Sequence, residues 1–247
     1  MKLFLILCYC FNVTWLTLFK TTAANDDQSY KILKFGQTTG DYVKFKPNMQ
    51  PFSDVFSICS WLRKLRSGAG KVWFSYATRP FGSGIAMTDD DESNMKSQAG
   101  VTIGSWYHYC VCWDLTSRTA TVYRNGTRIL SGSTPVGKRL DTDGYLVLGQ
   151  GQEYYSGEFL GRQVFGGELS KLNVFSKKLS SSEVNEIYSA GRCSEIEKKH
   201  DDTRHLKWED ILQQPRTGNV SVITDTSFSC QLEKELKQLE RQLAEAV

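Results

Sequence analysis

The sequence predicts an all-β protein built as a sandwich of two antiparallel sheets, with one short helix and a C-terminal amphipathic helix. Three observations carry this prediction. Between residues 30 and 223, short apolar runs of strand length alternate with turn residues. Aromatic residues make up 12% of the chain and there are five prolines, which favours a sheet-rich core. The runs follow one another without intervening helices, as in a sandwich rather than in βαβ units.

Several runs have the composition of buried strands. Each is rich in aromatic and β-branched side chains and ends near glycine, serine or proline. Two further runs, 121–124 and 127–130, flank Asn125-Gly126, a dipeptide that favours a two-residue hairpin turn because both residues accept positive φ. The strands predicted in the first group are Val55–Leu62, Val72–Ala77, Trp106–Trp113 and Tyr145–Gly149.

One short helix is predicted in the last third of the chain. Ser180 and Glu183 have the spacing of a capping box. In this motif the serine hydroxyl accepts a hydrogen bond from a free main-chain amide of the first turn, and the glutamate carboxylate accepts one from the main-chain amide of the serine. Val184 and Ile187 follow at helical spacing, and Gly191 supplies a stop. Such a helix would lay one apolar stripe against the sandwich.

Residues 1–24 have the pattern of a secretory signal peptide. Met1-Lys2 precede an apolar run from Leu3 to Phe19, and small residues up to Ala24 provide a cleavage site. A membrane anchor is the alternative, but polar residues interrupt the run, which barely reaches the length that spans a bilayer. We therefore expect a secreted, extracellular protein with no membrane span after signal removal, and a folded domain over residues 25–224.

Residues 225–247 predict a short coiled-coil tail. Apolar residues recur at alternating spacings of four and three, which gives a heptad seam with charged residues around it. Two heptads are too few for a stable isolated coiled coil. The tail therefore either pairs between subunits or lies as an amphipathic helix on its own domain. The seam consists of Leu232, Leu236, Leu239, Leu243 and Ala246.

Signal removal leaves five cysteines, at positions 59, 110, 112, 193 and 230. In an oxidising compartment most of them should pair, and the odd count implies a free thiol or an interchain bond. Cys193 follows the predicted helix and Cys230 precedes the tail. A bond between these two would tie the tail to the domain or link neighbouring subunits, and the sequence does not choose between these connectivities.

Charge and short motifs narrow the set of partners. The net charge of +3 is too small and too dispersed for a nucleic-acid-binding protein. Arg63, Lys64 and Arg66 have a spacing associated with heparin, although such runs also arise by chance on solvent-facing strand ends. Asn125 and Asn219 begin N-glycosylation sequons, of which Asn125, at the predicted hairpin tip, is favoured as the accessible one.

The strand around Cys110 carries a family motif. His108-Tyr109-Cys110-Val111-Cys112-Trp113 resembles the pentraxin signature, which begins His-x-Cys-x-Ser/Thr-Trp, with Cys112 in place of the hydroxyl residue. The resemblance extends from about Tyr30 to Ile223 and implies a jelly-roll subunit of the concanavalin and laminin-G type in a cyclic, pentameric homo-oligomer. Other segments that are similar to the family, in the same order, are Phe56–Cys59, Phe74–Thr78, Leu148–Glu153, Gly157–Gly161 and Leu206–Trp208.

The resemblance implies a disulfide between Cys59 and Cys110, on neighbouring strands. Cys112 is then the odd thiol, buried where the family has a small hydroxyl residue. Cys–His catalysis is disfavoured, because His108 and the cysteines alternate along one strand and no third group orients the histidine. Zinc binding is disfavoured too, because a disulfide-bonded cysteine offers no thiolate.

Pentraxins typically bind two calcium ions on one face, and those ions hold the ligand. Position by position, an acidic residue and its asparagine neighbour fall here on Gly82 and Ser83, and two glutamates fall on Gly151 and Leu160. Calcium takes six to eight oxygen ligands, many of them carboxylates. The resemblance therefore implies calcium as a cofactor, but only an incomplete, weak set of ligands remains for it: the main-chain carbonyl of Gln152 and the side chains of Glu153 and Gln163.

Two other acidic features could compensate for the missing ligands. Glu158 lies close to Leu160, and residues 89–92 are consecutively acidic. Such a run is more typical of a solvated loop than of a metal site. We therefore predict that the usual calcium site is absent or weak.

These observations favour a secreted, lectin-like recognition protein that binds extracellular glycan or phospholipid-like ligands as a homo-oligomer. A structural or adhesive extracellular protein that no longer binds calcium is the alternative. A glycan-cleaving enzyme is disfavoured, because hydrolases need two carboxylates spaced across a cleft and no strand supplies such a pair. We expect no enzymatic activity.

Overall fold

The computed structural model describes residues 31–47, 52, 54–67, 71–79, 83–88, 102–133, 143–225 and 242. The predicted signal peptide, the acidic run 89–92 and all but two residues of the predicted tail lie outside this part of the chain. Predictions about those segments are not tested by the structure.

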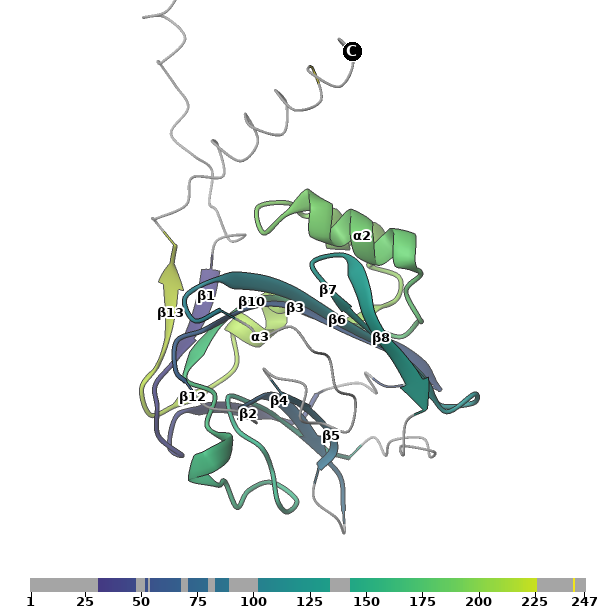
Figure 1. Ribbon diagram of the computed structural model, residues 1–247. Helices are drawn as coiled ribbons and strands as arrows, with labels where there is room; N and C mark the ends of the chain where they lie inside the picture. Colours follow the sequence, from purple (N-terminus) through teal and green to yellow (C-terminus); the bar gives the residue numbers. More distant parts are fainter. Residues whose placement is uncertain are drawn as a thin grey trace, which may run out of the picture.

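The first sheet forms one layer of the sandwich (Figure 1). Its strand order within the described residues is β13-β1-β10-β3-β6-β7-β8, with β11 paired to β10, and the neighbours are antiparallel. The strands are β1 (Lys31–Phe35), β3 (Val55–Lys64), β6 (Trp106–Asp114), β7 (Thr119–Arg124), β8 (Thr127–Ser133), β10 (Gly167–Phe175), β11 (Arg204–Leu206) and β13 (Val220–Thr224).

The second sheet lies below the first in Figure 1. Its order is β12-β2-β9-β4-β5, again with antiparallel neighbours. The predicted all-β sandwich is therefore confirmed, and the predicted strands 55–62, 72–77, 106–113 and 145–149 are present with ends that shift by at most two residues. The strands of this sheet are β2 (Tyr42–Phe45), β4 (Val72–Ala77), β5 (Ser83–Thr88), β9 (Tyr145–Leu148) and β12 (Arg216–Thr217).

The hydrophobic core lies between the two sheets. Phe56 from β3 and Phe74 and Tyr76 from β4 are fully buried there. The ring of Phe52 lies between the sheets, with its centroid 5.0 Å from that of Phe56 and 4.7 Å from that of Tyr76. Edge-to-face and tilted contacts of this kind add to the stabilisation that burial of the rings provides.

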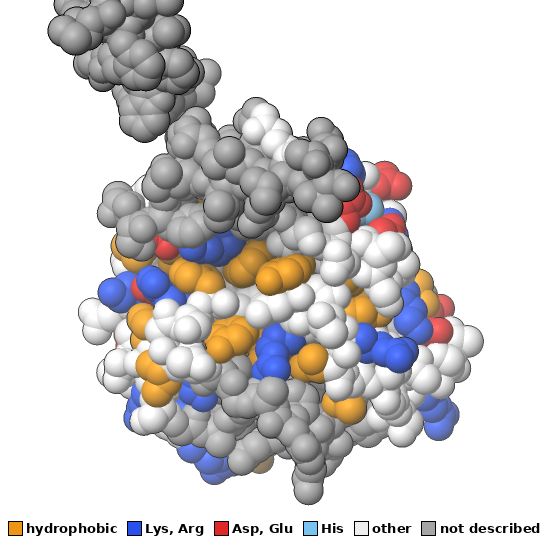
Figure 2. Space-filling view, turned by 45° about the horizontal axis from the view of Figure 1, so that its top comes forward, with side chains coloured by type: hydrophobic (Ala, Val, Ile, Leu, Met, Phe, Trp, Pro, Cys, Tyr) orange, Lys and Arg blue, Asp and Glu red, His pale blue; other side chains and the backbone are white. Residues whose placement is uncertain are grey.

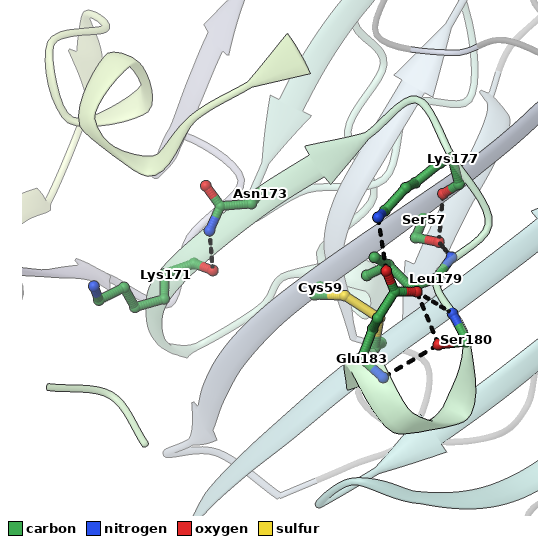
Figure 3. The surroundings of a disulfide bond; sticks show 9 residues. Ser57, Cys59, Lys171, Asn173, Lys177, Leu179, Ser180 and Glu183 are labelled. Atoms are coloured by element: carbon green, nitrogen blue, oxygen red, sulfur yellow. Dashed lines mark hydrogen bonds and ion pairs between the residues drawn. A yellow bond between two sulfur atoms is a disulfide. The ribbon is translucent and has the colours of Figure 1, made fainter. Parts of the chain in front are cut away.

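Helix α2 (Ser181–Ala190) covers part of the outer face of the first sheet (Figure 1). Its predicted capping box is confirmed, because Ser180 Oγ accepts from the Glu183 amide at 3.3 Å and Glu183 Oε2 accepts from the Ser180 amide at 2.7 Å (Figure 3). Gly191 ends the helix with φ of 79°, as predicted. The side chains of Val184 and Ile187 are buried beneath it.

The predicted disulfide between Cys59 and Cys110 is confirmed. The two residues are direct partners in the β3–β6 ladder, and their Cα atoms lie 4.0 Å apart. A small apolar cluster that includes Leu179, Val184 and Ile187 packs around the sulfur atoms. The disulfide bond and helix α2 therefore pack against each other on the same face of the sheet.

A serine of β3 positions the chain that enters α2. Ser57 Oγ donates to the Lys177 main-chain oxygen and accepts from the Leu179 amide, both at 2.9 Å (Figure 3). The Lys177 ammonium in turn donates to Glu183 Oε1 at 2.7 Å. These bonds join the sheet, the connecting segment and the capping box into one continuous unit.

A second α-helix lies late in the chain, where none was expected from the sequence. Strand β11 ends at Leu206, and the short helix α3 (Trp208–Leu212) follows. The start of α3 is capped from a distance, since Asn173 Oδ1 accepts from the Trp208 amide at 3.1 Å.

Charged and hydrophobic side chains are mixed on the surface. On the face drawn in Figure 2, Lys and Arg side chains are interspersed with hydrophobic ones, and acidic side chains lie mainly along its right side. This distribution agrees with the small net charge of +3. The molecule therefore has locally basic areas on its surface although its net charge is small.

Candidate functional site

The segment between β9 and β10 lies across the outer face of the second sheet. Ser75, whose side chain leaves β4 on that face, donates through Oγ to the Gln150 main-chain oxygen at 2.8 Å. The Gln150 amide nitrogen donates to the Thr38 main-chain oxygen at 2.8 Å. The segment contains the short 3-10 helix η2 (Gly161–Gln163) and includes all three predicted calcium ligands.

Gln152 is a structural residue of this segment. Its side chain is almost fully buried, and its amide nitrogen donates to the Tyr145 main-chain oxygen at 3.0 Å and to Ser75 Oγ at 3.2 Å. Its amide oxygen accepts from the Ser156 amide at 3.2 Å. These bonds hold the segment on the sheet.

Glu153 and Gln163, the other predicted ligands, bind each other. The Gln163 amide nitrogen donates to Glu153 Oε1 at 2.8 Å, and the Arg162 guanidinium lies 4.0 Å from the same oxygen. The buried Gln163 Oε1 has no hydrogen-bond partner among the described residues and packs against Gly151, where an added Cβ would clash with it. A glutamate side chain at position 151 would not fit this arrangement.

The described residues do not fit a calcium ion. Calcium takes six to eight oxygens, whereas this segment brings one carboxylate, Glu153, next to one neutral amide. Positive charge is also near, because the buried Lys71 ammonium donates to the Arg162 main-chain oxygen at 2.6 Å. No group of three or more His, Cys, Asp or Glu that could hold a metal occurs in the described part of the chain.

His108 and Cys112 do not form a catalytic pair. His108 is 1% exposed, and its ring lies 5.3 Å from that of Trp61 and 6.2 Å from that of Tyr188. Burial lowers the pKa of His108 to about 3, and burial raises the pKa of the free Cys112 thiol to about 11. At neutral pH the thiol is therefore protonated and the histidine is a poor base.

The predicted heparin-binding run does not form one basic surface. Arg63 Nε donates to Glu168 Oε2 at 2.5 Å, and the Arg63 guanidinium stacks 5.0 Å from the Trp106 ring. Lys64, the next residue on the strand, is 7% exposed. Arg66 is half-buried and donates to the Gln37 main-chain oxygen at 3.4 Å. Heparin binding by this run stays a prediction.

The two sequons occupy different environments. Asn125 and Gly126 form the predicted hairpin turn with φ of 49° and 74°. The Asn125 side chain is half-buried, and its Oδ1 accepts from the His108 amide at 3.0 Å. Asn219 is exposed. Exposure therefore favours Asn219, the reverse of the order expected from the sequence, and glycosylation of either site stays a prediction.

Cys193 is disulfide-bonded and lies just after α2. Its predicted partner, Cys230, lies outside the described residues, so that pairing stays a prediction. The Arg192 guanidinium pairs with the Asp225 carboxylate at 3.2 Å. The end of the described chain is thus held close to the residues that follow α2.

Comparisons with known proteins identify the family. The model of the pentaxin family, whose members are also called pentraxins, matches residues 31–211. The chain belongs to the pentraxin family. This assignment supports a pentraxin-like recognition protein that is not an enzyme. Burial of His108 and the disulfide bond of Cys110 give these two residues of the signature motif a structural role.

Two curated relatives illustrate the range of the family. Neuronal pentraxin-1 of Homo sapiens is 29% identical over 163 residues, which is 62% of this chain and 37% of the relative. C-reactive protein 1.1 of Limulus polyphemus is 25% identical over 214 residues, or 78% of this chain and 86% of the relative. This pentraxin thus spans little more than a third of the neuronal relative.

A solved structure has the same fold. The native heptameric SAP-like pentraxin from Limulus polyphemus superimposes with a TM-score of 0.66 at 19% identity, covering 82% of this chain and 98% of that one. The similarity confirms the jelly-roll architecture. No helix among the described residues is long and apolar enough to cross a membrane.

Proposed function

We propose that this pentraxin is a secreted recognition protein that binds glycan or phosphate-bearing ligands as an oligomer, without calcium to hold the ligand. One observation supports the proposal that calcium does not hold the ligand. Glu153, the carboxylate of the depleted ligand set, is already bonded to Gln163 and lies beside Arg162. A divalent cation would have to displace both partners and would gain few oxygens.

Secretion and assembly are supported by separate features. The N-terminal 24 residues have the pattern of a signal peptide, and Cys59–Cys110 is a disulfide, which is typical of extracellular proteins. A similar Limulus pentraxin is heptameric. A ring of subunits would present several weak sites on one face and so raise the avidity for a surface with repeated ligands. We propose such a ring, a pentamer on the family pattern.

An adhesive or structural extracellular protein is the second candidate. The hydrogen bond between Gln163 and Glu153 supports this candidate too. In the family, calcium holds the bound molecule, so loss of the calcium site removes one reason to expect binding of a glycan or phosphate group. The two functions differ in ligand binding. A recognition protein binds a defined class of glycan or phosphate group, whereas an adhesive protein binds partner proteins or copies of itself.

The experiment is an array of glycans and phosphate-bearing lipids, probed with the mature full-length protein in calcium and in EDTA, together with a native-mass measurement. We expect one ligand class to bind equally in both buffers, and an oligomeric mass. Glu153→Gln is the matched control and should leave binding unchanged. Binding that requires calcium and is lost in Glu153→Gln would refute the proposal, and binding to no ligand of the array would favour the adhesive protein.

A further inference from the structure

Basic and aromatic side chains gather on the outer face of the second sheet, beside the segment that carries Glu153. They come from β2 and the residue after it, from a residue that follows β4, from β9 and from the segment itself, so the sheet brings together distant parts of the sequence. We call this set the basic-aromatic row, and it consists of Tyr42, Lys44, Lys46, Arg79, Tyr145 and Tyr155.

Lys44 lies at the centre of the row. Its ammonium is 5.8 Å from the ring centroid of Tyr42 and 5.6 Å from that of Tyr145. It donates to the main-chain oxygen of Ser156 at 3.2 Å, and no carboxylate of the described residues forms an ion pair with it. The two rings attract the cation through their faces and restrict its position.

Lys46 and Arg79 lie around the next ring of the row. The Lys46 ammonium is 5.1 Å from the Tyr145 centroid and 5.9 Å from the Tyr155 centroid, and the Arg79 guanidinium is 4.9 Å from the Tyr155 centroid. Lys46 pairs with Asp143 at 2.5 Å, but that carboxylate is 73% exposed. Arg79 is exposed and has no ion pair with the described residues. Three cations therefore face one acid.

We propose that the basic-aromatic row binds a linear sulfated glycan directly, without calcium. This inference rests on the proposed function and deepens it, because it names the ligand class and the side chains. Lys44, in β2, and Lys46, just after the strand, are two residues apart, about 7 Å along an extended chain, and both ammonium groups lie near the Tyr145 ring. Ammonium and guanidinium groups bind sulfate oxygens through charge-assisted hydrogen bonds. The rings beside them offer flat surfaces on which sugar rings can pack.

The arrangement fits a chain of anions better than a single phosphate. A phosphate site usually converges several donors, often main-chain amides, on one point. In the row the cationic groups are instead spread over three aromatic rings, so each can meet a different sulfate.

The arrangement also fits a glycan better than a membrane surface. Peripheral membrane binding uses apolar side chains that enter the lipid in addition to basic ones. Among the described residues, the large hydrophobic side chains that are clearly exposed are Ile103 and Tyr154. The rings of Tyr42, Tyr145 and Tyr155 are half-buried, so they are held on the protein and not free to insert into a lipid layer.

The test is titration of the mature full-length protein, in EDTA, with heparin and with chemically desulfated heparin as the probe pair. Removing one charge-assisted contact should weaken binding about tenfold, so Lys44→Gln with Arg79→Gln should weaken heparin binding roughly a hundredfold. The conservative pair Lys44→Arg with Arg79→Lys should retain most of the affinity. Lys34→Gln, on the exposed side of β1, and Arg66→Gln are matched controls that should leave it unchanged.

The possible outcomes distinguish a wrong binding site from a wrong function. Heparin binding that survives Lys44→Gln with Arg79→Gln, or that Arg66→Gln removes, would overturn the row as the site and leave the recognition function intact. Equal affinity for desulfated heparin, or binding only to phosphate ligands or phosphatidylserine vesicles, would overturn the sulfated-glycan class. Failure of the wild type to bind any ligand of the array would overturn the proposed function itself. Near-ultraviolet circular dichroism shows that each variant is folded.

Discussion

The outer faces of the two sheets are used differently. On the first sheet, α2 packs over the Cys59–Cys110 bond, and His108 is buried among aromatic rings. On the second sheet, a segment without regular strands crosses the face and leaves Lys44 and Lys46 partly or fully open to solvent. We infer that the first face stabilises the fold, whereas the second is free to bind ligands.

The burial patterns of the strands record this difference. All nine residues of β10 are buried, because that strand is covered on both faces. In β2, residues 42 to 45 alternate between half-buried and buried, because one side faces the core and the other lies on the outer face of the sheet. Burial of every residue therefore marks a strand covered on both faces, and alternation marks a strand with one partly open face.

The largest expected effect comes from removing the disulfide. Cys59→Ala with Cys110→Ala should lower the free energy of unfolding by roughly 4 kcal/mol, because the bond closes a long loop and restricts the unfolded chain. Urea unfolding of the variant and of a Cys112→Ala control measures this loss. Unchanged stability would show that the face under α2 does not carry the role we assign to it.

Low pH should reduce the free energy of unfolding through protonation of His108, which lies on the same face. Burial holds its folded pKa at about 3, whereas the unfolded chain takes up a proton near pH 6.5. Its contribution to stability is therefore present above pH 6.5 and is lost as the pH falls toward 3, at about 1.4 kcal/mol per pH unit. Urea midpoints of wild type and His108→Phe between pH 7 and 4 measure it, and equal slopes would contradict the assignment.

The cap of α2 should contribute less. Ser180→Ala removes the hydroxyl that accepts from the Glu183 amide, and it should cost about 1 kcal/mol. Ser189→Ala, at an exposed position near the end of the same helix, is the control and should cost little. A loss in Ser189→Ala as large as that in Ser180→Ala would show that the cap is not the source.

The smallest effect on stability is expected on the second face. Lys44→Gln with Arg79→Gln should change the free energy of unfolding by less than about 0.5 kcal/mol, because both side chains are at the surface and have no ion pair among the described residues. The same variant should lose heparin affinity. A large loss of stability would mean that this face is structural as well, and the contrast between the two faces would fail.

Local features were predictable from the sequence. The Asn125-Gly126 turn and the capping box at Ser180 depend on neighbouring residues, and both are confirmed. Helix α3 was missed because its cap comes from Asn173, 35 residues earlier in the chain. No short-range pattern could indicate that contact.

The binding surface was predictable only in part. The sequence located the segment around Glu153 but could not show that the Gln163 amide would donate to Glu153, a residue ten positions earlier in the chain. The basic-aromatic row was missed entirely, because its members become neighbours only when the sheet forms. Lys44 alone in an alternating strand looks like an ordinary solvent-facing lysine.

Calorimetric titration of the mature protein with calcium tests the central claim most directly. A surface that recognises ligands through its own cations should give no saturable calcium binding in the micromolar range, and Glu153→Gln should behave like the wild type. Micromolar affinity that disappears in Glu153→Gln would show that the segment between β9 and β10 holds a calcium ion, which would contradict the claim.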